Sequence, residues 1–161
     1  MNTVYSFEPI FDKNSKVLIL GTVPSITSRE KNFYYSHASN RFWKIFENLF
    51  NVKLNTVEEK INFLLKNNIA LWGTIKKCDI EGSKDSSIRN VHVNDINSIL
   101  KLTNIKTIYV TGKVALNIYN KQIYNKTNIE AIYLPCPSSA NASFNLEKLT
   151  EIYKIILNNL K

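Results

Sequence analysis

The chain has 161 residues, of which 44% are hydrophobic, and a formal net charge of +8 at pH 7. This length suits one domain, expected to span residues 1–161, that buries about two-thirds of its unfolded surface. Two cysteines cannot supply a metal or iron–sulfur centre held by four thiolates, and no apolar run reaches the roughly 18 residues that span a bilayer. The first residues also lack the basic-then-apolar order of a signal peptide. We therefore expect a cytoplasmic protein with reduced cysteines and no membrane contact.

The positive charge favours a polyanionic partner. The chain has 21 lysine and arginine residues against 13 aspartate and glutamate residues, an imbalance typical of proteins that bind nucleic acid. A composition simply rich in lysine, asparagine and isoleucine, as an AT-rich coding sequence gives, would explain the same excess. Charge alone therefore suggests nucleic-acid binding and leaves both explanations open.

In chain order, residues 1–16 form an apolar lead-in that we expect to pack against a sheet edge. Short apolar runs that stop at polar or turn-forming residues predict four buried strands. The expected strands are residues 17–20, 69–72, 107–110 and 129–134. Apolar residues at helical spacing predict the helices between and after them. The expected helices are 41–50, 56–66 with a capping box of Thr56 and Glu59, 95–102 capped by Asp95, 114–119, and 146–157.

Strands that alternate with helices predict a parallel sheet covered on both faces. We expect an α/β protein with three α/β/α layers around a short, mainly parallel four-stranded central sheet. Polar loops at residues 21–40, 73–90 and 135–144 follow strand ends, and we expect no regular structure within them. Because the carboxyl ends of parallel strands meet at one edge, these loops should converge on one site.

The three loops combine aromatic, amide and cationic side chains. Such a set suits a nucleic acid, with bases to stack and phosphates to hold. The side chains are Tyr34, Tyr35, His37, Asn40, Lys76, Lys77, Ser83, Lys84, Asp85, Arg89, Ser138, Ser139 and Asn141. The chain has neither GxxxxGK[ST] nor GxGxxG, which argues against kinase-like and dinucleotide-binding functions.

Three ordered stretches of the chain are similar to one known family. Residues 21–25, GTVPS, and 34–43, YYSHASNRFW, resemble its first motif, G-S-x-P-G followed by Y-Y-A-H-P-x-N-x-F-W. Residues 70–72, ALW, and 78–88, CDIEGSKDSSI, resemble A-L-W-D-V and C-x-R-E-G-S-x-D-x-x-I, while residues 134–142, LPCPSSANA, resemble L-P-S-T-S-P-A-N-A. From about residue 17 onward the chain thus resembles the uracil-DNA glycosylase superfamily, in particular its hypoxanthine-DNA (deoxyinosine) glycosylase family.

The resemblance implies a monofunctional DNA glycosylase that starts base excision repair. Its substrate would be double-stranded DNA with a deaminated base, chiefly hypoxanthine, and it would act as a monomer without a cofactor or metal. Relatives that act on uracil and thymine mismatches carry a catalytic asparagine in G-I-N-P-G, but here that position is Val23, which cannot orient water. In the deoxyinosine family the catalytic asparagine is that of H-x-x-N, which by position is Asn40. The resemblance also implies that Tyr35 stacks on the flipped base, while His37 could stabilise the departing base.

The other site residues are expected to play two roles. Those expected to bind the base are Gly21, Thr22, Val23, Pro24, Tyr34, Tyr35, Ser83 and Asp85. Those expected to contact DNA are Ser138, Ser139, Ala140, Asn141, Ser143, Lys76, Lys77, Lys84 and Arg89. No lysine is placed where a Schiff base would be needed, so strand cleavage is not expected.

The chain departs from the family pattern at four places. Ser25 replaces a glycine, Ala38 and Ser39 follow His37 where H-P-x is usual, Ser139 replaces a proline, and Gly73 replaces an aspartate. The changes at Ser25 and Ser139 alter loop stiffness and so bear on which damaged base fits.

Simpler explanations exist for most of these residues. Asn40 can merely cap the helix that follows it, and Tyr34 and Tyr35 can be core aromatics. His37 can be an ordinary loop histidine, and Asp85 can hold its own loop through bonds to the backbone. For the whole protein, uracil as the main substrate and a noncatalytic nucleic-acid-binding module are the alternatives.

Overall fold

A parallel four-stranded sheet forms the centre of the computed structural model, which describes residues 1–161. Its strands are β2 (Val17–Gly21), β3 (Ile69–Gly73), β6 (Thr107–Thr111) and β7 (Ala131–Leu134). They lie in the order β3-β2-β6-β7, and every neighbouring pair is parallel. The four predicted strands are confirmed, with β7 beginning at Ala131 rather than at residue 129.

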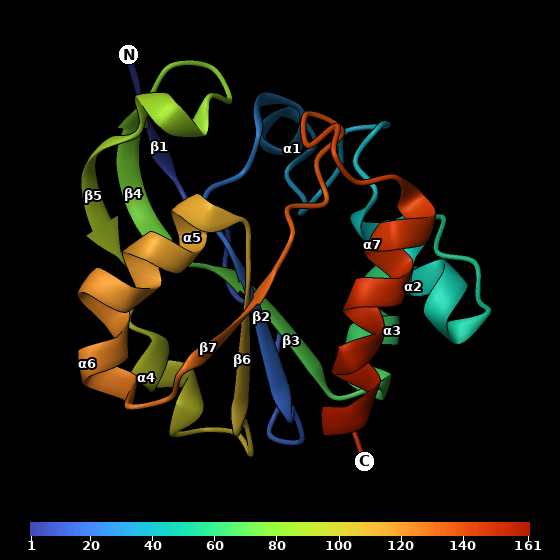
Figure 1. Cartoon of the computed structure of the whole chain (residues 1–161). Coiled ribbons are helices and arrows are strands. Elements are labelled where there is room, and N and C mark those ends of the chain that lie inside the picture. Colours follow the sequence, from blue (N-terminus) through green and yellow to red (C-terminus); the bar gives the residue numbers. More distant parts are fainter.

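Helices cover both faces of this sheet (Figure 1). One face carries α2 (Phe42–Phe50), α3 (Val57–Lys66), α7 (Leu146–Tyr153) and the 3-10 extension η3 (Lys154–Asn159). The other face carries α4 (Ile96–Leu100), α5 (Lys113–Ile118), the π-helical turn η2 (Tyr119–Ile123) and α6 (Tyr124–Thr127). The predicted three-layer α/β/α arrangement is therefore confirmed.

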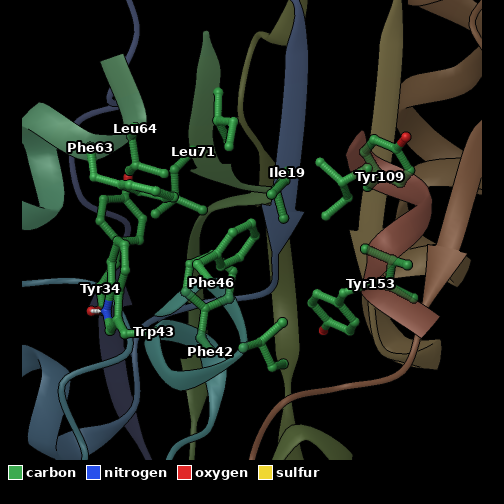
Figure 2. Packing of buried hydrophobic residues seen from close by; sticks show 14 of the residues in the cluster. Ile19, Tyr34, Phe42, Trp43, Phe46, Phe63, Leu64, Leu71, Tyr109 and Tyr153 are labelled. Carbon is green, nitrogen blue, oxygen red and sulfur yellow. Dashed lines mark hydrogen bonds between the residues drawn. The ribbon is translucent and has the colours of Figure 1, made fainter. Parts of the chain in front are cut away.

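Strand β2 is buried on both faces of the sheet. Its successive side chains point to opposite faces, so that Ile19 joins one apolar cluster and Leu20 the other. Figure 2 shows Ile19 on the same side as Phe42, Phe46 and Tyr153, which close that face. This double burial explains the unbroken apolar run in the sequence.

Helices α3 and α4 both begin where predicted, but the predicted side-chain cap is confirmed only at α3. The Thr56 hydroxyl accepts the Glu59 N–H and the Glu59 carboxylate accepts the Thr56 N–H, so the capping box is present. Asp95 precedes α4 but makes no side-chain capping bond, so this predicted cap is wrong. The ψ angle is 86° at Asp95 and 159° at Thr56. Thr56 thus has the extended backbone that lets a side chain cap a first turn, and Asp95 does not.

A second, antiparallel sheet contradicts two predictions. Strands β1 (Asn2–Tyr5), β4 (Ile75–Ile80) and β5 (Arg89–Val93) pair in the order β1-β4-β5, where we expected an irregular lead-in and an irregular loop. The pairing of β4 with β5 has register shifts, which break the alternation of apolar residues that predicts a strand. The expected packing of the lead-in on the sheet edge does occur at Ile10, whose N–H and C=O both bond Leu71 of β3.

Two short helices lie in loops that were predicted to be irregular. Helix α1 (Ile26–Lys31) begins two positions after Pro24, and the Ser25 hydroxyl accepts the Ser28 N–H as its cap. Ser25 has a φ of −66°, so a serine fits where the family pattern has glycine. The turn η1 (Asp85–Ser87) interrupts the second loop.

Candidate active site

The three polar loops converge on one cavity at the carboxyl ends of β2, β3 and β6. Its volume is about 640 Å³, which lies within the usual range for small-molecule sites. Thirteen of the residues predicted for the site line it. These are Gly21, Thr22, Val23, Pro24, Tyr34, Tyr35, Asn40, Ser83, Lys84, Asp85, Ser138, Ala140 and Asn141.

Six predicted residues do not line the cavity. These are His37, Ser139, Ser143, Lys76, Lys77 and Arg89. Lys76 and Lys77 lie on β4 of the second sheet, and Arg89 begins β5, where its guanidinium donates to the Ser86 and Ile88 carbonyls. Five of these six residues were expected to contact DNA, and only His37 was expected to act on the base.

The lining also includes residues that the sequence analysis missed. Ser6 and Phe7 come from the lead-in, Thr111 ends β6, and Cys136 follows β7. Of these, Thr111 was within reach of sequence reasoning because it ends a predicted strand at the edge where sites form. Phe7 could not be found in that way, because no local pattern links it to the sheet edge.

Tyr35 forms one flat wall of the cavity. Its ring stacks on the buried Phe42 ring with 4.0 Å between centroids and 9° between planes. Burial raises the pKa of its hydroxyl, and a hydrogen bond with Thr111 partly offsets this. A Cβ on Gly21 would lie 2.9 Å from the Tyr35 hydroxyl oxygen, so a glycine at that strand end lets the ring approach β2.

Tyr34 is mainly a structural residue. Its hydroxyl donates to the Glu8 carbonyl at 2.7 Å, and its own carbonyl accepts the Trp43 indole N–H at 3.1 Å. Its ring belongs to the apolar cluster under α2 and α3. The core explanation therefore fits Tyr34, although the residue also touches the cavity.

Asn40 reaches the cavity and precedes Arg41, the N-cap residue of α2; Arg41 makes no side-chain capping bond, and Asn40 instead bonds the first N–H of the helix. Its side-chain oxygen accepts the Phe42 N–H at 2.9 Å, and its backbone N–H donates to the His37 carbonyl at 2.9 Å. The side-chain nitrogen bonds no protein acceptor. The capping bond thus holds the amide in one orientation while leaving its donor group free.

His37 lies outside the cavity in an exposed hydrogen-bonded chain. Its Nδ1 lies 2.7 Å from the Ser39 hydroxyl and accepts the Ser39 N–H at 3.1 Å. The Ser39 hydroxyl lies 2.8 Å from that of Ser139. Two positions where the chain departs from the family pattern therefore contact each other across 100 residues of sequence.

Asp85 lies at the mouth of the cavity. Burial against the cavity wall raises the pKa of its carboxyl, and a hydrogen bond with Thr22 partly lowers it. The side chain does not bond its own loop. That loop is held by Ser87, whose hydroxyl accepts the Glu81 N–H at 2.9 Å and donates to the Lys84 carbonyl at 2.7 Å. Asp85 thus contributes to its loop only through its backbone carbonyl, which accepts the Ile88 N–H at 3.2 Å, and a role for its carboxylate at the base stays a prediction.

Gly73 and Val23 both line the cavity. A Cβ on Gly73 would lie 2.7 Å from the Thr22 carbonyl oxygen, so the aspartate of the family pattern would not fit this backbone. Val23 packs against the apolar cluster beneath β4. Both residues shape the floor of the cavity without offering a polar group.

Arg41 is the main residue that sequence reasoning overlooked. Its guanidinium donates to carbonyl oxygens of the 135–144 loop, and Asn141 of that loop also donates from its side chain to the Cys136 carbonyl at 3.1 Å. The only sequence signal was its place beside Asn40 in the first motif.

No set of three or more His, Cys, Asp and Glu side chains is arranged to hold a metal ion. None of the helices has the length and apolar character needed to cross a membrane.

Comparisons with known proteins define the class to which this fold and cavity belong. A family model described as the uracil DNA glycosylase superfamily matches residues 8–161. The chain belongs to that superfamily, as its motifs predicted, and is a DNA glycosylase with DNA as its substrate.

Individual relatives place the chain more closely. It is 30% identical to a hypoxanthine DNA glycosylase from Methanosarcina acetivorans over 148 residues, which cover 90% of this chain and 92% of the relative. It is 33% identical over 111 residues to a hypoxanthine DNA glycosylase from Methanosarcina barkeri, with 66% and 70% covered. A solution NMR structure of a candidate uracil DNA glycosylase from M. acetivorans superposes with a TM-score of 0.81 at 27% identity, covering 97% and 99% of the two chains.

Proposed function

We propose that this protein is a monofunctional DNA glycosylase that hydrolyses the N-glycosidic bond of deaminated bases, chiefly hypoxanthine. The observation that carries the proposal is the pairing of an aromatic wall, Tyr35 on Phe42, with the free amide of Asn40 in one cavity. The two relatives named hypoxanthine DNA glycosylase support the choice of base.

The cavity suits a base flipped out of the duplex. One face of the Tyr35 ring rests on Phe42, so the ring is a rigid platform. Stacking of a base on an aromatic ring contributes about 1–3 kcal/mol and is tolerant of base identity. Selection among bases must therefore come from the polar groups at the rim.

Asp85 is the group best placed to reject adenine and cytosine, the undamaged parents of hypoxanthine and uracil. Hypoxanthine, xanthine and uracil each carry an N–H on the pairing edge, at the position where adenine and cytosine carry an acceptor nitrogen. An ionised carboxylate accepts hydrogen bonds only, so it would bind the first group and repel the second. Thr22 also lines the cavity, and its hydroxyl favours the charged form of the carboxyl by lowering the pKa of Asp85.

Asn40 is proposed to act on the sugar rather than on the base. Positive charge develops on the sugar as the base departs, and the carbonyl oxygen of the amide, which has a second lone pair besides the one that accepts the Phe42 N–H, can hold a water molecule beneath C1′. The bond from the Phe42 N–H fixes the amide before substrate arrives, so little reorganisation is needed at the moment of reaction. His37 does not line the cavity, so the proposal rests on Asn40.

The exposed 138–143 segment and the basic residues near the cavity are proposed to contact the duplex. Lys84 lines the rim, and Lys76, Lys77 and Arg89 lie on the second sheet beside it. Phosphate contacts of this kind supply affinity without sequence preference.

A single-turnover assay on duplexes with one inosine, uracil or xanthine tests the proposal. We expect fastest release from inosine, and at least about a 100-fold loss in Asn40→Ala. The abasic product should stay uncut, and borohydride should trap no covalent adduct. Fastest release from uracil would favour the alternative of a uracil glycosylase, suggested by the description of the solved structure. Release from no substrate, with DNA binding retained, would leave only a binding module.

A further inference from the structure

The guanidinium of Arg41 is enclosed by one loop. Nη2 donates to the Ser138 carbonyl at 2.6 Å and the Asn141 carbonyl at 3.1 Å, and Nε donates to the Pro137 carbonyl at 3.2 Å. Nη1 donates to the Phe144 carbonyl, and the Arg41 backbone N–H donates to Pro137 as well. All of these acceptors are main-chain carbonyls, so the half-buried charge is solvated by the loop itself.

Besides Arg41, three side-chain contacts hold the loop: the Tyr153 hydroxyl donates to the Pro135 carbonyl, the Ser39 and Ser139 hydroxyls contact each other, and the Asn141 side chain donates to the Cys136 carbonyl. No helix or strand lies between Leu134 and Leu146. Within it, the Asn141 N–H donates to Ser138 and the Phe144 N–H donates to Asn141. Because the carbonyls of Ser138 and Asn141 also accept from Arg41, the same guanidinium supports both internal bonds.

Because the carbonyls that accept from Arg41 point toward its guanidinium, backbone N–H groups of the loop face outward. Ser139, Ala142 and Ser143 are exposed, and their backbone N–H groups bond no protein acceptor. Free N–H groups beside a fixed positive charge form a surface that suits a DNA phosphate. The Arg41 side chain therefore sets which N–H groups of the loop face outward, although the duplex would not contact Arg41 itself.

We propose that Arg41 is a positioning residue that seats the 137–144 loop on duplex DNA in register with Asn40. This inference rests on the proposed glycosylase function. Asn40 and Arg41 are adjacent, and Ser39 on their other side contacts Ser139. One short segment therefore carries the catalytic amide and holds the loop, so the position of the loop on the duplex sets the position of the amide at the sugar.

The test compares duplex and single-stranded DNA with one inosine each. In Arg41→Met, kcat/KM on the duplex should fall about 100-fold, as expected when a reacting group is misplaced by about an ångström. On the single strand, which has no duplex for the loop to engage, the loss should be below about 10-fold. Arg41→Lys keeps the charge but lacks the planar fork, so its duplex loss should be intermediate.

Lys106→Met is the matched control. Lys106 is exposed and precedes β6 at the amino end of the sheet, so this change also removes one charge but lies far from the cavity. The duplex-to-single-strand ratio should stay at the wild-type value. Equal losses on both substrates in Arg41→Met, or no loss on either, would overturn the proposal. If Arg41→Met does not fold, the ratio in Arg41→Lys decides.

Amide hydrogen exchange gives a second measurement that needs no activity. The N–H groups of Asn141 and Phe144 should exchange faster in Arg41→Lys than in the wild type, while those in β6 should be unchanged. Unchanged exchange in the loop would contradict the proposed role. A wild type that releases no base would defeat the proposed function, and the exchange rates would still report whether Arg41 organises the loop.

Discussion

The two walls of the cavity are held in place by different means. The base wall, residues 21–40 and 81–88, contains helix α1, the turn η1 and the Tyr35 ring stacked on Phe42. The duplex wall, residues 135–144, contains no helix or strand, and its carbonyls converge on Arg41. The base wall is therefore fixed in part by regular structure and ring packing, whereas the duplex wall is held from outside by hydrogen bonds, most of which come from Arg41.

This difference predicts that substitutions in the two walls will affect excision from single-stranded and double-stranded DNA differently. Changes in the base wall should reduce excision from single-stranded and double-stranded DNA alike, because both present the same base. Changes in the duplex wall should reduce mainly excision from the duplex. The predictions below follow from this contrast.

The largest effect is expected at Asn40. Asn40→Ala removes both the amide and the cap, and should lower stability by about 1 kcal/mol in addition to its loss of rate on both substrates. Asn40→Ser keeps a capping oxygen, so it should recover most of the stability and little of the rate. Urea unfolding and single-turnover rates measure the two effects. A near-wild-type rate in Asn40→Ser would mean that the residue is only a cap.

Removing the aromatic platform should have the next largest effect. Tyr35→Leu should weaken substrate binding about 5- to 150-fold on both substrates, because stacking is worth about 1–3 kcal/mol. Tyr34→Phe is the control, since it removes only the bond to the Glu8 carbonyl. It should cost about 1 kcal/mol of stability and leave KM unchanged. Similar KM changes in both variants would show that Tyr35 acts only through the core.

Asp85 should give the site an acid-sensitive rate. Protonation of its carboxyl removes the acceptor for the base N–H, so the rate on inosine should fall as pH drops through the raised pKa. Asp85→Asn should abolish this pH dependence and slow excision about 10-fold or more at neutral pH, since hydrogen bonds to charged groups are worth about 1.5–3 kcal/mol. An unchanged pH–rate profile in Asp85→Asn would show that this carboxylate does not contact the base.

The contribution of Asp85 to folding stability should increase as pH drops, whereas the excision rate should decrease. Because folding raises the pKa of Asp85, the folded protein binds this proton more tightly than the unfolded chain does. The contribution of this group to stability is therefore greatest below the ordinary aspartate pKa, and it declines as pH rises through the raised value. Urea midpoints of wild type and Asp85→Asn across that window measure the difference.

The smallest effect is expected at Ser139. Ser139→Ala removes the exposed contact with the Ser39 hydroxyl but leaves every bond from Arg41 in place. Duplex excision should fall less than about 5-fold, because an exposed neutral hydrogen bond is worth about 1 kcal/mol or less. Excision from a single strand should not change. A loss as large as that in Arg41→Met would mean that the serine bridge, rather than Arg41, sets the loop.

The sequence by itself determined the central sheet and most of the cavity lining. Strands such as β2 are buried on both faces, so burial leaves a continuous apolar run that can be recognised without neighbours. The end of β2 then places Gly21 at one edge of the sheet, and the motif residues Tyr35, Asn40 and Asp85 follow in the loops beyond the strands. Local patterns were sufficient to locate this edge, because strands that alternate with helices run parallel and so have their carboxyl ends on the same side of the sheet.

Only the tertiary structure decided the second sheet and the role of Arg41. Strand β4 is defined by hydrogen bonds to β1, which lies more than 70 residues earlier, and its irregular register hides the pattern of a strand. Arg41 bonds carbonyls 96 to 103 residues further along the chain. Main-chain carbonyls are the same in every residue, so no side-chain pattern could identify these acceptors, and only folding brings them to the guanidinium.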